Sequence, residues 1–167
     1  MTCEQQQIPM LKWLNQKNIT MQDLIDAALE LYVPHPGVET IQKATAFLEE
    51  ELLAALSDPN VATLITAAFH AQEDAERGLI PGLSTEYFMG RPGLVADELI
   101  GIAIATYIAG AKGMFEYVRF DQAKPGILKK LGPLTNDPIG ALIAGAASNM
   151  YSRATKNTIT PASSLSP

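Results

Sequence analysis

Apolar residues recur three or four positions apart through most of this chain, which is the spacing of an α-helix that buries one face. In the segment after Thr20, for example, Leu24, Ala28 and Tyr32 fall on one side of a predicted helix. Thr20 can cap this helix through its hydroxyl, and Asp23 places a carboxylate near the exposed amide groups of the first turn. The segment is therefore predicted to be an amphipathic helix with a defined start.

Prolines and glycines separate further helical segments. Asp58-Pro59 indicates a helix start, with the aspartate as cap and the proline at the first helical position. The pattern between residues 115 and 120 fits either a short strand or a bent helical piece. Residues 79–92 are rich in Gly and Pro and are predicted to form a long loop, either a lid or a simple connection. Helices are predicted over residues 8–16, 21–32, 38–56, 59–77, 94–111, 127–131 and 138–154.

The elements show neither a strand–helix–strand rhythm nor an internal repeat, so an all-α fold is predicted. A chain of 167 residues fits one domain with a substantial core. We expect a single-domain bundle of about six to eight helices over residues 1–155. Residues 156–167 are polar and carry two prolines, which predicts a flexible C-terminal tail.

Charge and cysteine content exclude several classes of protein. The net charge is −6, and no run of Lys or Arg provides a footprint for a nucleic-acid backbone. Cys3 is the only cysteine, which excludes an internal disulfide and a cysteine-based zinc cluster. The N-terminal sequence does not look like a secretory signal, and the uncharged stretches 99–111 and 138–152 are shorter than a ~20-residue transmembrane helix. A cytoplasmic protein without a transmembrane segment is the expectation.

The sequence also lacks the common signatures of nucleotide binding and of nucleophilic hydrolysis. Neither Gly-x-x-x-x-Gly-Lys-Ser/Thr nor Gly-x-Gly-x-x-Gly occurs, and Gly-x-Ser-x-Gly and His-Glu-x-x-His are also missing. The two histidines, His35 and His70, lie far apart in the sequence, and solvated or structural roles are commoner for such residues. Acid–base chemistry would therefore fall to carboxylates.

Acidic residues interrupt the apolar second half of the chain at three places: Asp97-Glu98, Asp121, and Asp137 after Asn136. Carboxylates among Ala, Ile and Gly are costly to bury unless a positive charge meets them, and a divalent cation is a good candidate. If the last two long helices pack antiparallel, with the Asp121 segment across their ends, the three places converge. This geometry predicts a metal site.

Each acidic position also has a simpler explanation. Asp97 and Glu98 open a predicted helix, where the helix dipole stabilises negative charge by ~0.3–1 kcal/mol. Asp121 and Lys124 are three residues apart and can form an ordinary ion pair. Asp137 precedes a proline and can simply cap the final helix. From the residues alone, both explanations stay open at each position.

The same residues resemble the phosphatidylglycerophosphatase A family, in particular its shorter, soluble, all-helical branch. The resemblance covers residues 94–153 and includes two departures from the family pattern. Asn136 replaces the first aspartate of an Asp-Asp pair, and Arg119 lies one residue after the family's arginine position, which is Val118 here. The matching segments are Val95-Ala96-Asp97-Glu98, Tyr117-Val118-Arg119-Phe120-Asp121-Gln122-Ala123-Lys124-Pro125, and Thr135-Asn136-Asp137-Pro138-Ile139-Gly140-Ala141.

The resemblance implies a hydrolase that is a magnesium-dependent phosphatase for a phosphate monoester, with Mn²⁺ as an alternative metal. The implied reaction converts phosphatidylglycerophosphate to phosphatidylglycerol, a step of phospholipid metabolism. Lys124 would neutralise the substrate phosphate, and Arg119 would be a second phosphate contact. The implied ligand or base residues are Asp97, Glu98, Asp121 and Asp137, with Asn136 as a further oxygen ligand.

Two other functions are compatible with the sequence. The membrane-embedded relatives carry a Gly-rich N-terminal motif and spanning helices that are not seen here, so the substrate could be a water-soluble phosphate ester. The chain could also be a non-catalytic helical binding or scaffold module on the same fold. In each case we expect a homo-oligomer, because many small and apolar residues need covering, and a phospholipid substrate would place the protein at the membrane surface.

Overall fold

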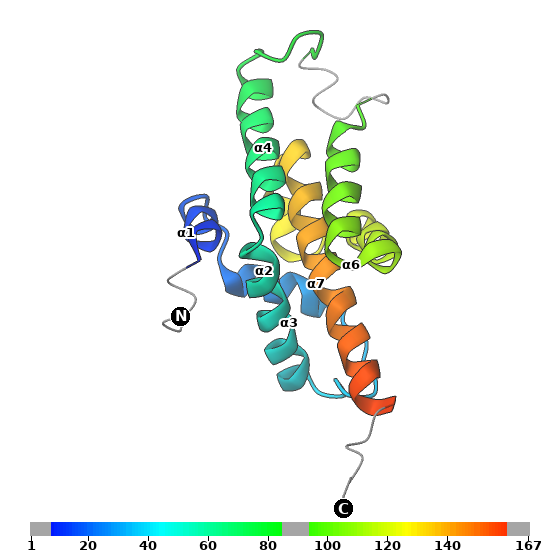
Figure 1. Cartoon of the computed structure of the whole chain (residues 1–167). Helices are drawn as coiled ribbons and strands as arrows, with labels where there is room; N and C mark the ends of the chain where they lie inside the picture. The colour runs from blue at the N-terminus through cyan, green and yellow to red at the C-terminus, as the bar shows by residue number, and fades with distance from the viewer. Residues whose placement is uncertain (1–7, 85–93, 160–167) are drawn as a thin grey trace, which may run out of the picture.

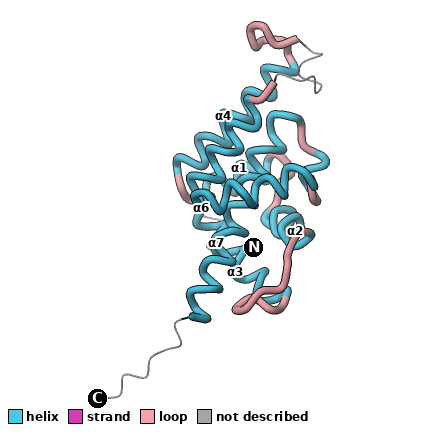
Figure 2. Tube along the Cα trace, turned by 90° about the vertical axis from the view of Figure 1, so that its right-hand side faces the viewer, coloured by secondary structure: helices cyan, strands magenta, loops and turns pink. Residues whose placement is uncertain are grey.

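The computed structural model describes residues 8–84 and 94–159, and within them it confirms the all-α prediction. Figure 2 shows these residues as helices and loops. Cys3, most of the predicted 79–92 loop and residues 160–167 lie outside the described residues. The helices are α1 (Pro9–Gln16), α2 (Met21–Glu30), α3 (Ile41–Leu56), α4 (Pro59–Glu76), α6 (Ala96–Ala123), the 3-10 helix η2 (Gly126–Lys130) and α7 (Pro133–Ile159).

The predicted starts of two N-terminal helices are confirmed by their capping contacts. The Thr20 hydroxyl accepts a hydrogen bond from the Asp23 amide, while the Asp23 carboxylate accepts one from the Thr20 amide at 2.8 Å. Asp58 accepts a hydrogen bond from the Asn60 amide at 2.7 Å, and Pro59 occupies the first position of α4. These are local interactions, which is why the sequence pattern alone was sufficient to predict them.

Helix α7 forms the centre of the bundle, with the other long helices around it (Figure 1). Between Leu134 and Met150 every residue of α7 is buried except Asn136 and Asn149. Small residues allow this close packing: a Cβ atom added to Gly145 would lie 2.8 Å from the Ile108 side chain on α6. The small residues of the last helix therefore allow it to pack at the centre of the bundle.

Helix α6 is broken in the middle. Ala109 and Gly110 leave the helical region, and Gly110 has φ = 62° and ψ = −150°, a conformation essentially restricted to glycine. The two halves pack closely, because a Cβ atom on Gly113 would lie only 2.2 Å from the Ala105 carbonyl oxygen. Residues 115–120 belong to the second half, so the bent helical interpretation of this segment is confirmed and the strand is excluded.

The predicted start and end of the last helix were both wrong. Helix α7 begins at Pro133 rather than Pro138, so Asp137 lies inside the helix and is not its N-cap. The Gly132 carbonyl accepts hydrogen bonds from the Thr135 and Asn136 amides, which starts the helix five residues earlier than expected. At the other end, α7 runs to Ile159 and includes the first residues of the predicted tail.

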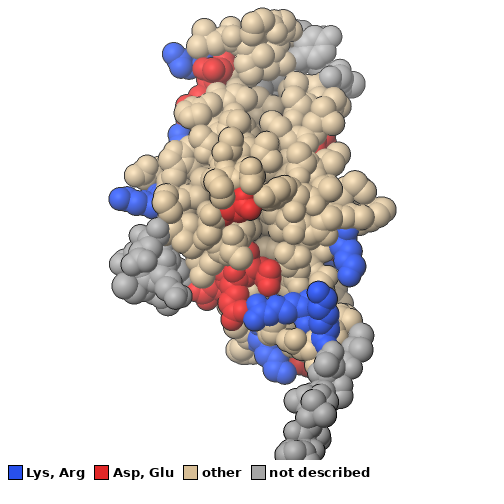
Figure 3. Space-filling view, viewed as in Figure 1, with Lys and Arg blue, Asp and Glu red and all other residues tan. Residues whose placement is uncertain are grey.

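One face of α6 is exposed although it is apolar. Val95, just before the helix, and Leu99 and Ile102 in its first half are exposed, and Phe115 is 69% exposed on the second half. Figure 3 shows few charged side chains over α4 and α6 on the face that it draws. By length and composition α6 could cross a membrane, but the break at Ala109–Gly110 divides it into two pieces, each shorter than the ~20 residues that a span needs.

Candidate metal centre

Three carboxylates from distant parts of the sequence meet at one point in the bundle. One oxygen each of Glu98, Asp121 and Asp137 lies within 4.8 Å of the other two. Glu98 comes from the first half of α6, Asp121 from its second half and Asp137 from α7. Asp137 is 2% exposed, whereas Glu98 and Asp121 are only partly buried. The structure thus brings together three of the four carboxylates that the sequence singled out.

The break in α6 is what brings Glu98 and Asp121 to the same place. Because the second half of the helix folds back along the first, Tyr117, one turn before Asp121, faces Glu98 and donates a hydrogen bond to it at 3.2 Å. Gly101 leaves room for the tyrosine ring, since a Cβ atom there would lie 2.6 Å from Tyr117. The hydroxyl of Tyr117 therefore orients the Glu98 carboxylate toward Asp121 and α7.

Lys124 lies in the middle of this group. Its ammonium nitrogen, Nζ, donates hydrogen bonds to Asp121 at 2.5 Å and to Asp137 at 2.6 Å, and also to the Asn136 side-chain oxygen. Lys124 itself follows the last turn of α6 with a positive φ of 45°. Its backbone amide bonds to the Phe120 carbonyl at 2.8 Å, which fixes the point from which the side chain starts.

The first turn of α7 is held by a side chain from α4. Gln72 is 8% exposed, and its side-chain oxygen accepts a hydrogen bond at 2.9 Å from the Leu134 amide, one of the amides that a helix start leaves without an internal partner. The Asn136 side-chain nitrogen donates to the Gly132 carbonyl at 3.1 Å, so its oxygen points toward Lys124. Gln72 therefore helps to position Asn136 and Asp137.

Burial and crowding of charge shift the pKa values of the group. Burial raises the pKa of Asp137 to about 6, although the hydrogen bond from Lys124 opposes the change. Burial, together with the charge of Asp121, also raises the pKa of Glu98. Burial would lower the pKa of Lys124, but its bonds to Asp121 and Asp137 outweigh that effect and raise it. Three carboxylates face one ammonium, so the negative charge is in excess.

This donor set fits a hard divalent cation. Carboxylate and amide oxygens are the ligands that Mg²⁺ and Mn²⁺ take in proteins, and Mg²⁺ commonly uses only a few of them and keeps several waters. Glu98, Asp121 and Asp137 could supply carboxylate oxygens. The Asn136 side-chain oxygen is close to them, because it accepts a hydrogen bond from the same Lys124 ammonium. The excess negative charge would be offset by such an ion.

Two predicted site residues are not part of this group. The Asp97 carboxylate accepts a hydrogen bond from the Glu98 amide at 3.0 Å, and it lies close enough to raise the pKa of Glu98 slightly. Arg119 donates hydrogen bonds to Glu116 at 2.6 Å and to the Leu31 carbonyl at 3.0 Å. Both terminal nitrogens of Arg119 are therefore engaged outside the group of three carboxylates, and its predicted contact with a phosphate stays a prediction.

Two residues of the site were missed from the sequence. Tyr117 could have been found, because it lies four positions before Asp121 and so on the same face of a helix. Its position inside the segment that resembles the phosphatase family was a further signal. Gln72 had no such signal, because its contact with Leu134 joins residues 62 positions apart.

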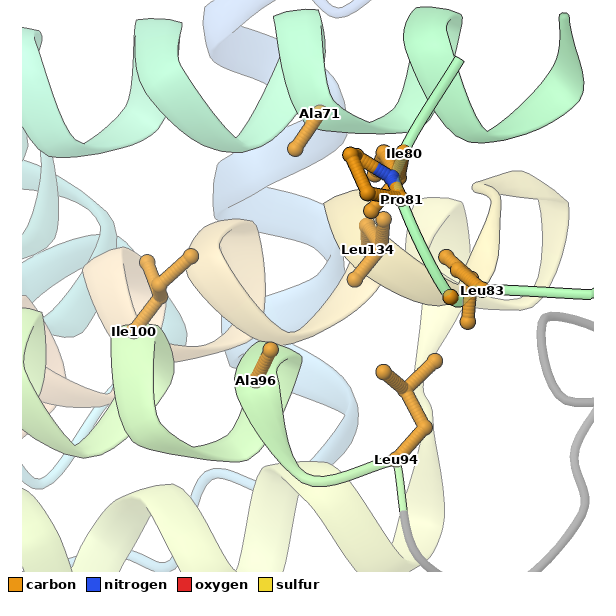
Figure 4. Close-up of a pocket in the computed structure, with 9 residues that line it drawn as sticks. Ala71, Ile80, Pro81, Leu83, Leu94, Ala96, Ile100 and Leu134 are labelled. Carbon is orange, nitrogen blue, oxygen red and sulfur yellow. The ribbon is translucent and has the colours of Figure 1, made fainter. Parts of the chain in front are cut away.

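An apolar cavity of about 390 Å³ lies near these helix ends but is separate from the carboxylates. In Figure 4 Ala96 and Ile100 point into the space between α6, Leu134 and α4. Residues four apart share a face of a helix, and Glu98, halfway between them, points to roughly the opposite side. The cavity and the carboxylate group are therefore on different faces of α6.

Comparison with known proteins places the chain in a family. No family model matches the sequence. The chain is 35% identical over 132 residues to the uncharacterized protein MJ1330 of Methanocaldococcus jannaschii, and the match covers 76% of this chain and 99% of that protein. The chain belongs to the family of MJ1330.

Solved structures of bacterial proteins share the fold of this MJ1330 family member. A protein of unknown function from Bacillus stearothermophilus matches with a TM-score of 0.72 and 23% identity over 91% of this chain and 99% of that one. The low temperature requirement C protein of Listeria monocytogenes matches with a TM-score of 0.73 and 22% identity over 91% and 97% of the two chains. Protein ypjQ of Bacillus subtilis, assigned to DUF64, has a TM-score of 0.71 and 20% identity over 93% and 99%. At these identities the likeness concerns the fold alone.

Proposed function

We propose that this protein is a Mg²⁺-dependent phosphomonoesterase whose cation is held by Glu98, Asp121 and Asp137. The observation that carries the proposal is the meeting of these three carboxylates, from three helical segments, within 4.8 Å of one another. Supporting it is the resemblance of the same residues to the phosphatidylglycerophosphatase A family. Mn²⁺ is a second candidate metal because it takes the same oxygen ligands.

Each of these side chains has a separate proposed role in the hydrolysis. The three carboxylates hold the ion, which when bound supplies a Lewis acid for the phosphoryl oxygens. Asp97 borders the group without belonging to it, and it is the candidate base that takes a proton from the attacking water. Lys124 supplies positive charge for the phosphate, whose bond to the alcohol oxygen breaks as the water oxygen adds to phosphorus.

Phosphatidylglycerophosphate is the proposed substrate, with a water-soluble phosphate ester as the alternative. The exposed apolar residues Leu99 and Ile102 lie on the same half of α6 as Glu98, and exposed Val95 directly precedes it, which supports work at a membrane surface by a cytoplasmic protein. Mg²⁺-stimulated phosphate release from micellar phosphatidylglycerophosphate, beside a panel of soluble phosphate esters, separates the two substrates.

Matched variants connect the activity to the carboxylate group. Asp137→Asn removes a buried ligand charge and should lower Mg²⁺-stimulated phosphate release by roughly 100-fold, in the range seen when a metal site is disturbed. Asp26→Asn removes an equal charge at an exposed position of α2 and should leave the rate unchanged. A folded wild-type protein that releases no phosphate from any ester would instead support the non-catalytic scaffold.

The same proposal includes a homo-oligomer whose contact lies on the second half of α6, apart from the membrane-facing residues near its start. Phe115 and Val118 are exposed on this second half, and Tyr107 is exposed shortly before the break. Exposed apolar patches of this kind often mark protein contacts. Light scattering on wild-type protein should give a mass above that of one chain, and Phe115→Ser should reduce it. A monomer at every concentration would leave the membrane surface as the partner of α6.

A further inference from the structure

The ammonium group of Lys124 binds the same side chains that are proposed to hold the cation. Its nitrogen lies 2.5 Å from Asp121 and 2.6 Å from Asp137, and it also bonds to Asn136. Asp121 and Asp137 each use one carboxylate oxygen for this contact, and both belong to the group of three carboxylates. Lys124 is thus the internal counter-charge of the site.

A divalent ion and this ammonium cannot be held by the same oxygens together. Mg²⁺ binds carboxylate oxygens at about 2.0–2.1 Å, so an ion on Asp121 and Asp137 would lie within a few ångströms of Nζ. Two positive charges at that distance repel strongly in a partly buried site. Asp121 and Asp137 each accept the hydrogen bond of Lys124 through Oδ1, so an ion would compete with the ammonium for these two carboxylates.

We infer that metal binding at this site is an exchange, in which the cation displaces the Lys124 ammonium from Asp121 and Asp137. This inference rests on the proposed function and adds that the Lys124 ammonium of the chain itself competes with the metal ion. Until the exchange occurs, the ammonium offsets the mutual repulsion of the carboxylates. After it, the ammonium is released from the carboxylates and is available to a substrate phosphate.

The position of Lys124 allows the side chain to move while the helices stay in place. Lys124 follows the last residue of α6, and its side chain is 35% exposed. The backbone at this point is fixed by the bond to the Phe120 carbonyl, but the four-carbon side chain can swing toward solvent by rotation about its own bonds. Asp137, by contrast, is 2% exposed and stays in the site.

Calorimetric titration with Mn²⁺ tests the exchange through binding rather than activity. Lys124→Met removes the competing ammonium and should tighten Mn²⁺ binding by roughly tenfold or more, because the ligands are then free in most molecules. Lys129→Met is the matched control: it removes one positive charge nearby, from a residue that is 63% exposed and 3.9 Å from Glu30. Its Mn²⁺ affinity should stay within about twofold of wild type.

A second measurement uses the wild-type chain and therefore does not depend on the folding of a variant. Lysine acetylation by acetic anhydride is followed by mass spectrometry with and without saturating Mg²⁺. Displacement should expose Lys124 and increase its acetylation rate several-fold, while the rate at Lys129 in the same molecule stays constant. An unchanged or slower rate at Lys124 in protein that binds Mg²⁺ would overturn the exchange.

The possible results separate this inference from the proposed function. If wild type binds Mn²⁺ and Lys124→Met binds it equally or more weakly, the exchange is wrong and the metal site remains. If only Lys124→Met binds Mn²⁺, the ammonium keeps the ion out of the wild-type site, so the exchange and the phosphatase proposal are both wrong. If neither protein binds Mn²⁺, both are wrong.

Discussion

Helices α6 and α7 are both long and rich in apolar and small residues, yet they have opposite surroundings. Helix α7 is buried on all sides through most of its length, whereas α6 exposes an apolar face that includes Leu99 at 62% and Phe115 at 69%. Helix α7 also runs without a break through Pro138, whereas α6 is broken at Ala109–Gly110. Composition alone therefore does not tell whether an apolar helix is a core helix or a surface helix.

The difference has a consequence for the candidate site. Helix α7 supplies the most buried carboxylate of the site, Asp137. Helix α6 supplies the two that are partly exposed, Glu98 and Asp121. The break in α6 is required for this arrangement, because a straight helix would place Glu98 and Asp121 more than 30 Å apart at ~1.5 Å per residue. Helix α7 thus contributes the buried carboxylate of the site, and the two halves of α6 contribute the partly exposed ones.

The largest expected difference between the two helices is the loss of stability when a leucine is replaced by alanine. Leu142→Ala on α7 removes a side chain that is 0% exposed and should lower the free energy of unfolding by about 2–5 kcal/mol. Leu99→Ala on α6 should change it by about 0.5 kcal/mol or less in the monomer. Urea unfolding of both variants, at a concentration where the protein is monomeric, measures the comparison. Equal losses would mean that α6 is as deeply packed as α7.

A smaller effect is expected where the two halves of α6 touch. In an ordinary exposed helix, Gly→Ala raises stability by about 0.5–1 kcal/mol. Gly113→Ala should do the opposite and lower the free energy of unfolding by about 1–3 kcal/mol, because the new methyl group would meet the Ala105 carbonyl. The same variant should weaken Mn²⁺ binding, since it separates Glu98 from Asp121. A gain in stability would show that the halves of α6 are not in contact.

The third prediction concerns pH and the buried carboxylate of α7. The pKa of Asp137 is raised from 3.8 to about 6, so the folded protein holds a proton there that the unfolded chain has already lost. The contribution of Asp137 to stability is therefore greatest below about pH 4 and declines as the pH rises to about 6. Denaturant unfolding in EDTA should show this decline in wild type and a smaller one in Asp137→Asn, where the raised pKa of Glu98 still contributes.

Metal binding should depend on the same protonation of Asp137, but Mn²⁺ affinity should increase with pH where the stability decreases. The ion needs the ionised carboxylate, so Mn²⁺ affinity should increase as the pH rises through about 6 and then level off. Calorimetry at several pH values measures this dependence. An affinity that is constant between pH 5 and 7 would show that Asp137 is not a ligand.

Local signals in the sequence were sufficient for most of the helices. The caps at Thr20 and Asp58 depend on residues two or three positions away, and both were predicted correctly. The start of α7 was wrong because two prolines, Pro133 and Pro138, carry the same signal. The choice between them is made by Gly132 and by Gln72 from another helix. Element starts that depend on a tertiary contact cannot be read from neighbouring residues.

The candidate site shows the same limit. The convergence of Glu98, Asp121 and Asp137 could be expected once the helices were assumed to pack antiparallel, because the carboxylates lie near predicted helix ends. The central position of Lys124 could not, since the sequence equally allowed a simple ion pair with Asp121. The pair of Arg119 with Glu116 is local to α6, whereas its bond to the Leu31 carbonyl is apparent only after the end of α2 has packed against α6.

The fold-back of α6 also bears on how quickly the site can assemble. Glu98 and Tyr117 are 19 residues apart in sequence, and Lys124 and Asp137 are 13 apart, so the contacts that build the site have a low contact order. Closing loops of this length costs little chain entropy, so we expect these contacts to form faster than the long-range ones. The long-range bond from Gln72 to Leu134 then joins this short stretch to the N-terminal half of the protein.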